Sequence, residues 1–374
     1  MKILLRILAR LGFAALLFIA ANHYYSRHQY AQDVRKYSRV KNRIDSAFRF
    51  GDIVYLGESS NTSFNPWTDT LAYSISEFLQ MYLPGQKIEA VTHEGYHPGL
   101  FRQMLNLWPE DNKKRTLIVT LNMRTCGPSA LYSSNEASNQ QEALFYSRRP
   151  PLLTRMYLSL HHYDNRNANE MERLKLQGWR TESLRKQQSG FPWATVRDWY
   201  DQNPYSQAGA PEKIRHMADA YIKEFAFLLD DKNPRIKDLD EIAAFCKKKN
   251  IRLIYHLLPE NRDYAKQLFG PYLISFMDAN ALFIASRYQK MGVELINNYP
   301  GLSGLNYTDQ WYPTEHFNAT IRQQIALSIA EKINAKEVHR VIHPARNNSP
   351  NPHILQPMAD TLLKEWREKV KLPW

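Results

Sequence analysis

Apolar positions follow two different patterns along the chain. Short continuous apolar runs bounded by turn residues are typical of strands buried on both faces of a parallel sheet. Runs of this kind predict strands over 52–56, 88–92, 116–121, 252–258 and 293–296. Apolar residues that recur every three or four positions predict helices over 70–81, 100–107, 238–249, 278–290 and 321–333. Strands that alternate with helices predict an α/β fold, with a parallel sheet covered by helices on both faces.

Residues 129–235 interrupt this alternation. They carry no strong strand pattern but many aromatic, histidine and arginine residues, with turn signals such as Arg149-Pro-Pro. We therefore expect a large helical insertion after the third strand. In an open α/β sheet this places it over the carboxyl ends of the strands, where ligands bind. It is either a lid that recognises substrate or a packing elaboration. Its aromatic residues either stack on sugar rings or pack in the core; they are Trp179, Trp193, Trp199 and Tyr200.

The N-terminus combines basic and apolar residues. Lys2, Arg6 and Arg10 flank an apolar run that ends at Ala21, which is typical of a signal peptide or a short signal anchor over 1–26. The basic residues favour a cytoplasmic N-terminus and an exported body. We expect a periplasmic or extracytoplasmic body anchored to the cytoplasmic membrane. The alternatives are a cleaved signal and a buried helix of a cytosolic protein.

Three further segments complete the predicted organisation. Apolar residues at helical spacing predict an amphipathic stalk helix over 27–49. The main domain is expected over 50–335, with the insertion inside it. Residues 336–374 are expected to form a C-terminal tail with one further helix over 358–370.

The net charge of +12 is concentrated near the N-terminus. Ten of the 49 Lys and Arg residues but only two of the 37 acidic residues lie in the first 50 positions. The folded body is thus nearly balanced, which argues against a nucleic-acid-binding protein. A basic segment next to an apolar one suits contact with anionic lipid headgroups instead.

Cysteine and histidine spacing limits the chemistry further. Cys126 and Cys246 are the only cysteines, which excludes a disulfide scaffold, a zinc finger and a cysteine-ligated cluster. The histidines show no metal-ligand spacing. We therefore expect neither a metal nor a cofactor.

The strongest local signal follows the first predicted strand. Gly57-Glu58-Ser59 places a serine at the carboxyl edge of the sheet, either as an exposed nucleophile or as a simple helix cap. Further polar residues come after the later strands. They are Gly95 in the loop His93-Glu94-Gly95, Asn122 after the third strand, and His316 before the last helix.

This order of Ser59, Gly95, Asn122 and His316 resembles the SGNH (GDSL-like) hydrolase superfamily. The insertion, the N-terminal anchor and the segment Leu258-Pro-Glu-Asn261 make it most similar to the DltD-like branch. The resemblance covers about residues 50–120 and 250–335. It implies a flavodoxin-like three-layer sheet, with Ser59 as nucleophile and His316 as general base. The backbone N–H groups of Ser59 and Gly95 and the side chain of Asn122 would form the oxyanion hole, with Gly99 as a second choice for Gly95.

The sequence departs from the family at the acid. Pro313 stands where the family has an aspartate, three residues before the histidine. Asp309, Glu315 or a backbone carbonyl would have to orient His316. We prefer Asp309, because side chains of adjacent residues usually point apart. Arg124 is a weaker candidate for substrate binding, with a salt bridge at the strand end as the alternative.

Two functions remain open, and lipolytic action on phospholipid, which only the membrane location favours, is a third possibility. The first is a serine-dependent esterase or acyltransferase acting on O-acetyl-type esters of cell-envelope carbohydrate, beside a membrane-bound O-acyltransferase. The second is a non-catalytic envelope protein with an SGNH-like fold that binds glycan or docks onto such an acyltransferase. The retained Ser, Gly, Asn and His favour the enzyme, and Pro313 favours the second function.

Overall fold

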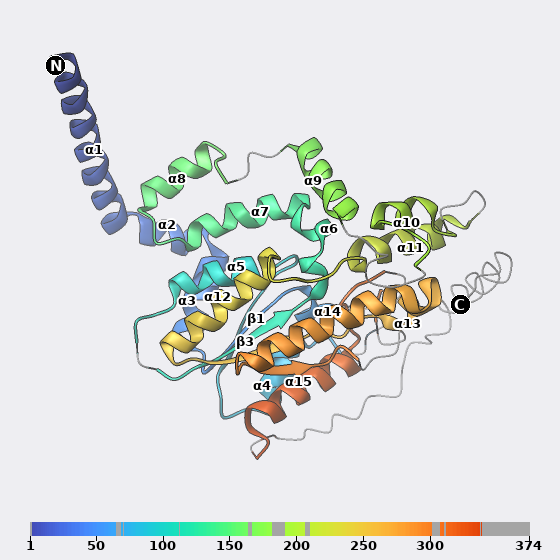
Figure 1. Ribbon diagram of the computed structural model, residues 1–374. Coiled ribbons are helices and arrows are strands. Elements are labelled where there is room, and N and C mark those ends of the chain that lie inside the picture. The colour runs from blue at the N-terminus through green and yellow to red at the C-terminus, as the bar shows by residue number, and fades with distance from the viewer. Residues whose placement is uncertain are drawn as a thin grey trace.

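The computed structural model describes residues 2–64, 69, 71–111, 113–163, 167–181, 191–205, 210–300, 307–309, 312–336 and 338. Within these residues, five parallel strands form one sheet in the order β2-β1-β3-β4-β5 (Figure 1). They are β1 (Ile53–Gly57), β2 (Ile88–Thr92), β3 (Thr116–Leu121), β4 (Arg252–Leu257) and β5 (Glu294–Asn297). This is the strand order of the flavodoxin-like doubly wound fold, so the predicted α/β class is confirmed.

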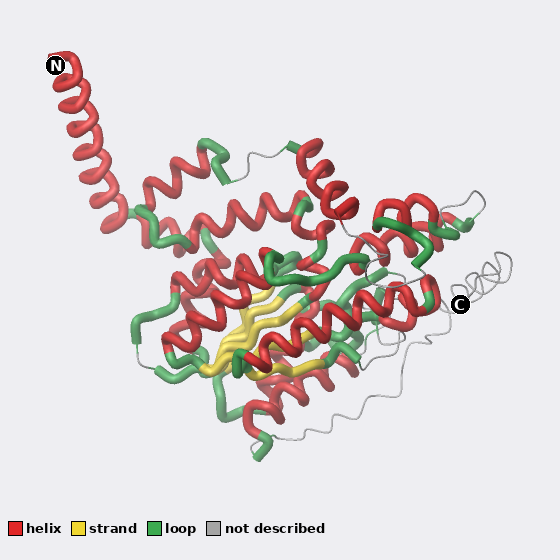
Figure 2. The backbone as a smooth tube through the Cα atoms, in the orientation of Figure 1, coloured by secondary structure: helices red, strands yellow, loops and turns green. Residues whose placement is uncertain are grey.

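Helices cover both faces of the sheet, as Figure 2 shows for the strands in yellow and the helices in red. Successive strand residues point to opposite faces, so Val54 and Leu56 enter one buried core while Ile53 and Tyr55 enter the other. The first core packs against α3 (Arg39–Phe50), α5 (Pro98–Met104), α12 (Pro234–Lys249) and α14 (Pro271–Lys290). The second packs against α4 (Ile75–Tyr82) and α15 (Ala319–Asn334).

Local residue chemistry explains where several helices begin. The helix predicted over 70–81 starts only at Ile75, because Ser74 and Glu77 form a capping box there. Helices α12 and α14 start earlier than predicted, each with a proline in its first turn. Helix α13 (Arg262–Phe269) was not expected from the sequence.

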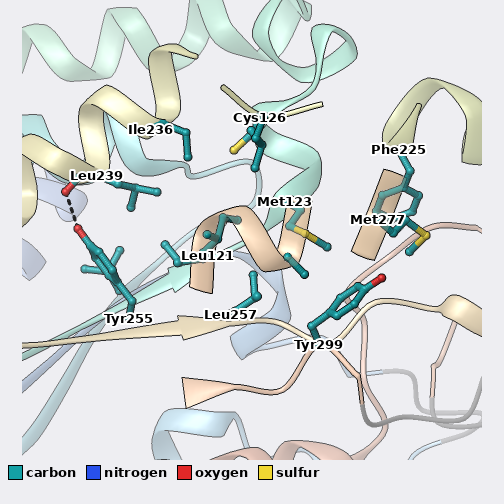
Figure 3. Close-up of a cluster of buried hydrophobic side chains, with 14 of the residues drawn as sticks. Leu121, Met123, Cys126, Phe225, Ile236, Leu239, Tyr255, Leu257, Met277 and Tyr299 are labelled. Atoms are coloured by element: carbon teal, nitrogen blue, oxygen red, sulfur yellow. Dashed lines mark hydrogen bonds between the residues drawn. The ribbon is translucent and has the colours of Figure 1, made fainter. Parts of the chain in front are cut away.

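Between β3 and α12, the described residues form helices and short 3-10 turns. The helices are α6 (Pro128–Leu131), α7 (Ser134–Ala143), α8 (Pro151–Ser159), α9 (Ala168–Thr181), α10 (Val196–Gln202) and α11 (Glu212–Phe225). The 3-10 turns are η3 (Met123–Cys126) and η4 (Leu144–Tyr146). Figure 3 shows Phe225 of α11 in the same buried cluster as Leu121 of β3, Leu257 of β4 and Met277 of α14. The segment is therefore packed onto the carboxyl end of the sheet.

The aromatic residues of this segment mostly serve packing. The rings of Trp193 and Trp199 stack with their centroids 5.2 Å apart, and both side chains are buried. Tyr200 is half-buried, and the Lys223 ammonium lies 4.8 Å from the centre of its ring. The side chain of Trp179 lies outside the described residues.

The first helix, α1 (Lys2–His28), projects from the body (Figure 1). None of its residues is buried, and it is long and apolar enough to cross a membrane. The helix is therefore not packed into the core of the described body. The stalk helix predicted over 27–49 is divided into α2 (Tyr30–Tyr37) and α3, because the Ser38 hydroxyl caps α3 by accepting from Lys41 N–H at 3.3 Å. The helix predicted over 358–370 lies outside the described residues.

Candidate active site

The serine of the candidate site lies at the carboxyl edge of the sheet. Strand β1 ends at Gly57, and Ser59 opens the 3-10 turn η1 (Ser59–Asn61). A Cβ atom at position 57 would lie 2.7 Å from the Tyr55 ring, which is too close for a normal contact. Glycine therefore fits at the end of this strand. The predicted position of Ser59 therefore follows from the end of β1.

His316 and Asp309 lie next to this serine. The Nε2 atom of His316 is 3.3 Å from Ser59 Oγ, and its Nδ1 is 2.5 Å from Asp309 Oδ2. A carboxylate at Nδ1 favours the tautomer in which Nδ1 donates and Nε2 accepts. The three side chains thus form a line of serine, imidazole and carboxylate, the arrangement that activates a serine nucleophile.

A short antiparallel contact explains how an aspartate seven residues away reaches the histidine. Tyr307 and Phe317 form an isolated β-bridge, and the Thr308 N–H donates to the His316 carbonyl at 2.8 Å. These contacts turn the chain back on itself and bring Asp309 beside His316. Of the acids considered from the sequence, Asp309 is the one that the structure places on the imidazole.

Glu315 does not take the position beside the His316 ring that the sequence left open for it. Its Oε1 accepts the Ser59 hydroxyl hydrogen at 2.9 Å, and its carboxylate forms an ion pair with Arg124. The side chain is therefore turned toward the serine, although it is adjacent to His316. In this state Glu315 and His316 compete for the same hydroxyl hydrogen. Arg124 forms the salt bridge that the sequence left as an alternative to substrate binding.

Asn122 is held by a carboxylate that the sequence analysis did not assign to the site. Its Nδ2 lies 2.9 Å from both carboxylate oxygens of Glu58, and its Oδ1 accepts from Arg124 N–H at 3.0 Å. The two oxygens of one carboxylate lie close together, whereas the two hydrogens of an amide diverge. One N–H of Asn122 therefore faces Glu58, and the other points elsewhere.

Gly95 lies in the wall of a cavity of about 280 Å³ beside these residues. Its φ of +72° is a conformation that favours glycine, and its carbonyl accepts from Asn139 Nδ2 at 3.0 Å. Helices α6 and α7 supply a large share of the wall, so the predicted insertion borders the candidate site. The lining residues are Glu58, Gly95, His97, Asn122, Arg124, Thr125, Ser129, Ala130, Ser133, Asn135, Glu136, Asn139, Glu224, Arg235 and Glu315.

Arg124 acts on several buried carboxyl groups at once. Burial raises the pKa of Glu58 to about 7 and that of Glu260 to about 8, and Arg124 opposes both shifts. Burial also raises the pKa of Glu224. Glu58 directly precedes Ser59, and Glu260 lies in the segment after β4. Nothing in the sequence indicates Glu224.

Cys126 and His256 are both buried in the body. Burial raises the pKa of the Cys126 thiol to about 12, which keeps it protonated and unreactive. His256 is buried, and its Nε2 lies 3.0 Å from Asn298 Nδ2. Within the described ranges, no group of three or more His, Cys, Asp or Glu residues is arranged to hold a metal ion.

Neither a comparison with models of known protein families nor one with curated protein sequences gives a match. We therefore infer the function from the geometry around Ser59.

Proposed function

We propose that this protein performs serine-dependent ester chemistry, with Ser59 as the nucleophile. The line from Ser59 Oγ through the His316 ring to Asp309 supports this proposal most strongly. A serine hydroxyl is a weak nucleophile unless a base stands within reach and is itself oriented by a third group. All three groups are present, at the edge of the sheet where ligands of this fold class bind.

The reaction would begin when Ser59 Oγ attacks an ester carbonyl carbon. His316 Nε2 takes the hydroxyl proton, and Asp309 stabilises the resulting imidazolium through Nδ1. Collapse of the tetrahedral intermediate passes the proton to the leaving alkoxide and leaves an acyl group on Ser59. Water or a sugar hydroxyl, deprotonated by His316, then attacks the acyl-enzyme and releases the acyl group. Before the first step, the Ser59 hydroxyl must turn from Glu315 to His316.

The oxyanion would be stabilised by N–H donors around the cavity. The backbone N–H groups of Ser59 and Gly95 are the proposed main-chain donors. The Asn122 N–H that does not face Glu58 is the third. Preorganised donors of this kind each contribute about 3–4 kcal/mol to transition-state stabilisation in known acyl-transfer enzymes.

The proposed substrate is a short acyl ester on carbohydrate of the cell envelope. A cavity of about 280 Å³ with mostly polar lining suits a small acyl group better than a long alkyl chain. The exposed apolar helix α1 supports an anchored protein whose body lies outside the cytoplasm. In that position the enzyme could exchange acyl groups with a membrane-bound O-acyltransferase.

A non-catalytic envelope protein is the second candidate function. One observation favours it: the Ser59 hydroxyl donates to Glu315, and Arg124 holds Glu315 in place. If this arrangement persisted in every state, Ser59 would not transfer its proton to His316. The cavity would then serve only to bind glycan, or the body would dock onto a membrane acyltransferase.

Labelling with a fluorophosphonate distinguishes the two functions. The full chain in detergent would be incubated with the probe and read by intact mass, beside Ser59→Ala and His316→Ala. Ser159→Ala, an exposed serine on α8, is the matched control. The enzyme predicts one label on the parent and the control and none on the two site variants. An unlabelled, folded parent would favour the non-catalytic protein.

A further inference from the structure

A second and larger cavity adjoins the one beside Ser59. Its volume is about 630 Å³, and it is bounded by α5, α7, α12 and the residues that follow α8. The two cavities share part of their lining, so they form neighbouring compartments of one hollow. The shared residues are His97, Glu136, Asn139 and Arg235.

Two of the shared side chains are buried and incompletely paired. Arg235 donates from Nη2 to Glu136 at 2.6 Å, and His97 Nε2 lies 3.1 Å from the same carboxylate. Arg235 Nε and His97 Nδ1 have no hydrogen-bond partner among the described residues, although both side chains are more than nine-tenths buried. An unpaired buried polar group destabilises the folded state. Both atoms have almost no accessible surface, so Arg235 and His97 line the hollow with their other atoms.

Gly99 keeps this wall open. A Cβ at position 99 would lie 2.7 Å from Arg235 Nη1 and 2.8 Å from Asp238 Oδ2. Both atoms belong to charged groups that line the larger cavity. Because Gly99 has no side chain, it leaves room for these two charged groups. This role differs from the donation to an oxyanion that the sequence suggested for Gly99.

The chemistry of the lining indicates the class of ligand. Planar polar groups predominate, among them Gln103, Gln140 and the ion pair of Arg102 with Asp238, whose nearest N and O atoms are 2.8 Å apart. Positively and negatively charged groups occur together, so the wall offers both hydrogen-bond donors and acceptors and has no strong net charge. Neutral sugar hydroxyls require such pairs of donors and acceptors. An alkyl chain would bury these polar groups without hydrogen bonds.

Three rings complete the lining. Tyr132, His162 and Tyr163 border the same cavity. Rings with a polar edge combine an apolar face with a hydrogen-bonding group, which suits the mixed surface of a sugar. The volume lies within the 300–1,000 Å³ range of small-molecule sites.

We propose that the larger cavity binds neutral sugar units of the oligosaccharide that carries or accepts the acyl group at Ser59. This inference rests on the proposed function, because it makes the cavity a subsite for the same substrate. The glycan would extend from the compartment beside Gly95, past Arg235 and His97, into the space between α7 and α12. Specificity for the polymer would then lie in the insertion and α12, apart from the reacting groups.

A cavity-filling variant with a neighbouring control tests this subsite. Gln140 on α7 lines the cavity, whereas Gln141 is exposed and does not. Gln140→Trp and Gln141→Trp therefore place the same large ring inside and outside the hollow. The probes are tetramers of glucose, xylose and N-acetylglucosamine, and binding to the full chain in detergent is measured by saturation-transfer NMR. Labelling of every variant with the fluorophosphonate is measured in parallel.

We expect at least one tetramer to bind the parent and Gln141→Trp, and its affinity to fall at least tenfold in Gln140→Trp. Equal affinity in both tryptophan variants, or no binding of any tetramer, would overturn the subsite. If the parent is labelled but binds no tetramer, the subsite fails while serine chemistry stands. If it binds a tetramer in this cavity but is never labelled, the subsite stands and the proposed chemistry fails.

Discussion

Replacing Asp309 with asparagine is expected to slow acylation of Ser59 while leaving the fold intact. Asparagine keeps the size of the side chain but can present an N–H to His316 Nδ1. The imidazole would then accept at Nδ1 and carry its hydrogen on Nε2, which is the wrong tautomer to take the Ser59 proton. The positive charge that forms on the ring would also lose its carboxylate.

The exposure of the pair sets the expected size of the effect. In a buried serine triad, the same substitution lowers kcat about 10⁴-fold. Here the Asp309 and His316 side chains are 41% and 31% exposed, so water partly replaces the lost carboxylate. We therefore expect a fall of about 10²- to 10³-fold, which corresponds to roughly 3–4 kcal/mol at about 1.36 kcal/mol for each factor of ten.

The assay is the second-order rate constant of fluorophosphonate labelling, followed by intact mass. Hydrolysis of 4-nitrophenyl acetate gives an independent rate, and circular dichroism checks the fold. Asp230→Asn, which changes an exposed loop aspartate, is the matched control. A labelling rate within threefold of the parent in a folded Asp309→Asn protein would refute the role given to Asp309.

Three further predictions concern groups around the site. Because the pKa of Glu58 is raised from about 4.5 to about 7 by burial, the folded state holds an extra proton in this range, and its stability falls as the pH rises from 4.5 to 7. Glu58→Gln should remove up to about 3 kcal/mol of this pH dependence. Urea unfolding between pH 5 and 8 measures it, and a free energy of unfolding that depends on pH as steeply as in the parent would contradict the prediction. Glu315→Ala removes the buried ion-pair partner of the half-buried Arg124 and should lower the free energy of unfolding by about 2 kcal/mol, whereas Glu172→Ala, from an exposed pair, should change it little. Arg322→Met, which leaves the buried Asp69 uncompensated, should cost about 3–5 kcal/mol, and a denaturation midpoint equal to that of the parent would contradict this.

Arg322 illustrates a structural residue that sequence patterns do not reveal. It is fully buried at the start of α15 and bonds to the main-chain carbonyls of Leu71, Tyr73 and Phe317 as well as to Asp69. These contacts tie the segment after Ser59 to the helix that follows His316. The contacts with Asp69, Leu71 and Tyr73 join residues about 250 positions apart, so no local pattern predicts them.

Strands were the most predictable part of the fold. The predicted runs 88–92 and 116–121 coincide with β2 and β3. Strand β4 ends one residue earlier than predicted, and β1 and β5 each begin and end one residue later. A strand buried on both faces must be apolar throughout, so its sequence marks its limits. Helix limits were less predictable, because the capping residues Ser38 and Ser74 decided them.

The residues of the candidate site could be predicted, and the preference for Asp309 beside His316 agrees with the structure, but the other contacts could not be predicted. Ser59 and His316 follow from their places beside a strand and a late helix. The pairing of Asp309 with His316 depends on the bridge between Tyr307 and Phe317, which spacing alone does not indicate. Glu315 lies in irregular backbone, where the rule that adjacent side chains point apart does not apply. The orientation of Asn122 depends on burial of Glu58, a tertiary effect.

Direct detection of an acyl group on Ser59 tests the central claim most directly. The full chain in detergent would be mixed with 4-nitrophenyl acetate, quenched in acid within seconds, digested and sequenced by tandem mass spectrometry. We predict an acetyl group on the Ser59 hydroxyl of the parent, and a loss of this modification in His316→Ala. Acetylation confined to lysines, with Ser59 unmodified in a folded parent, would contradict the account.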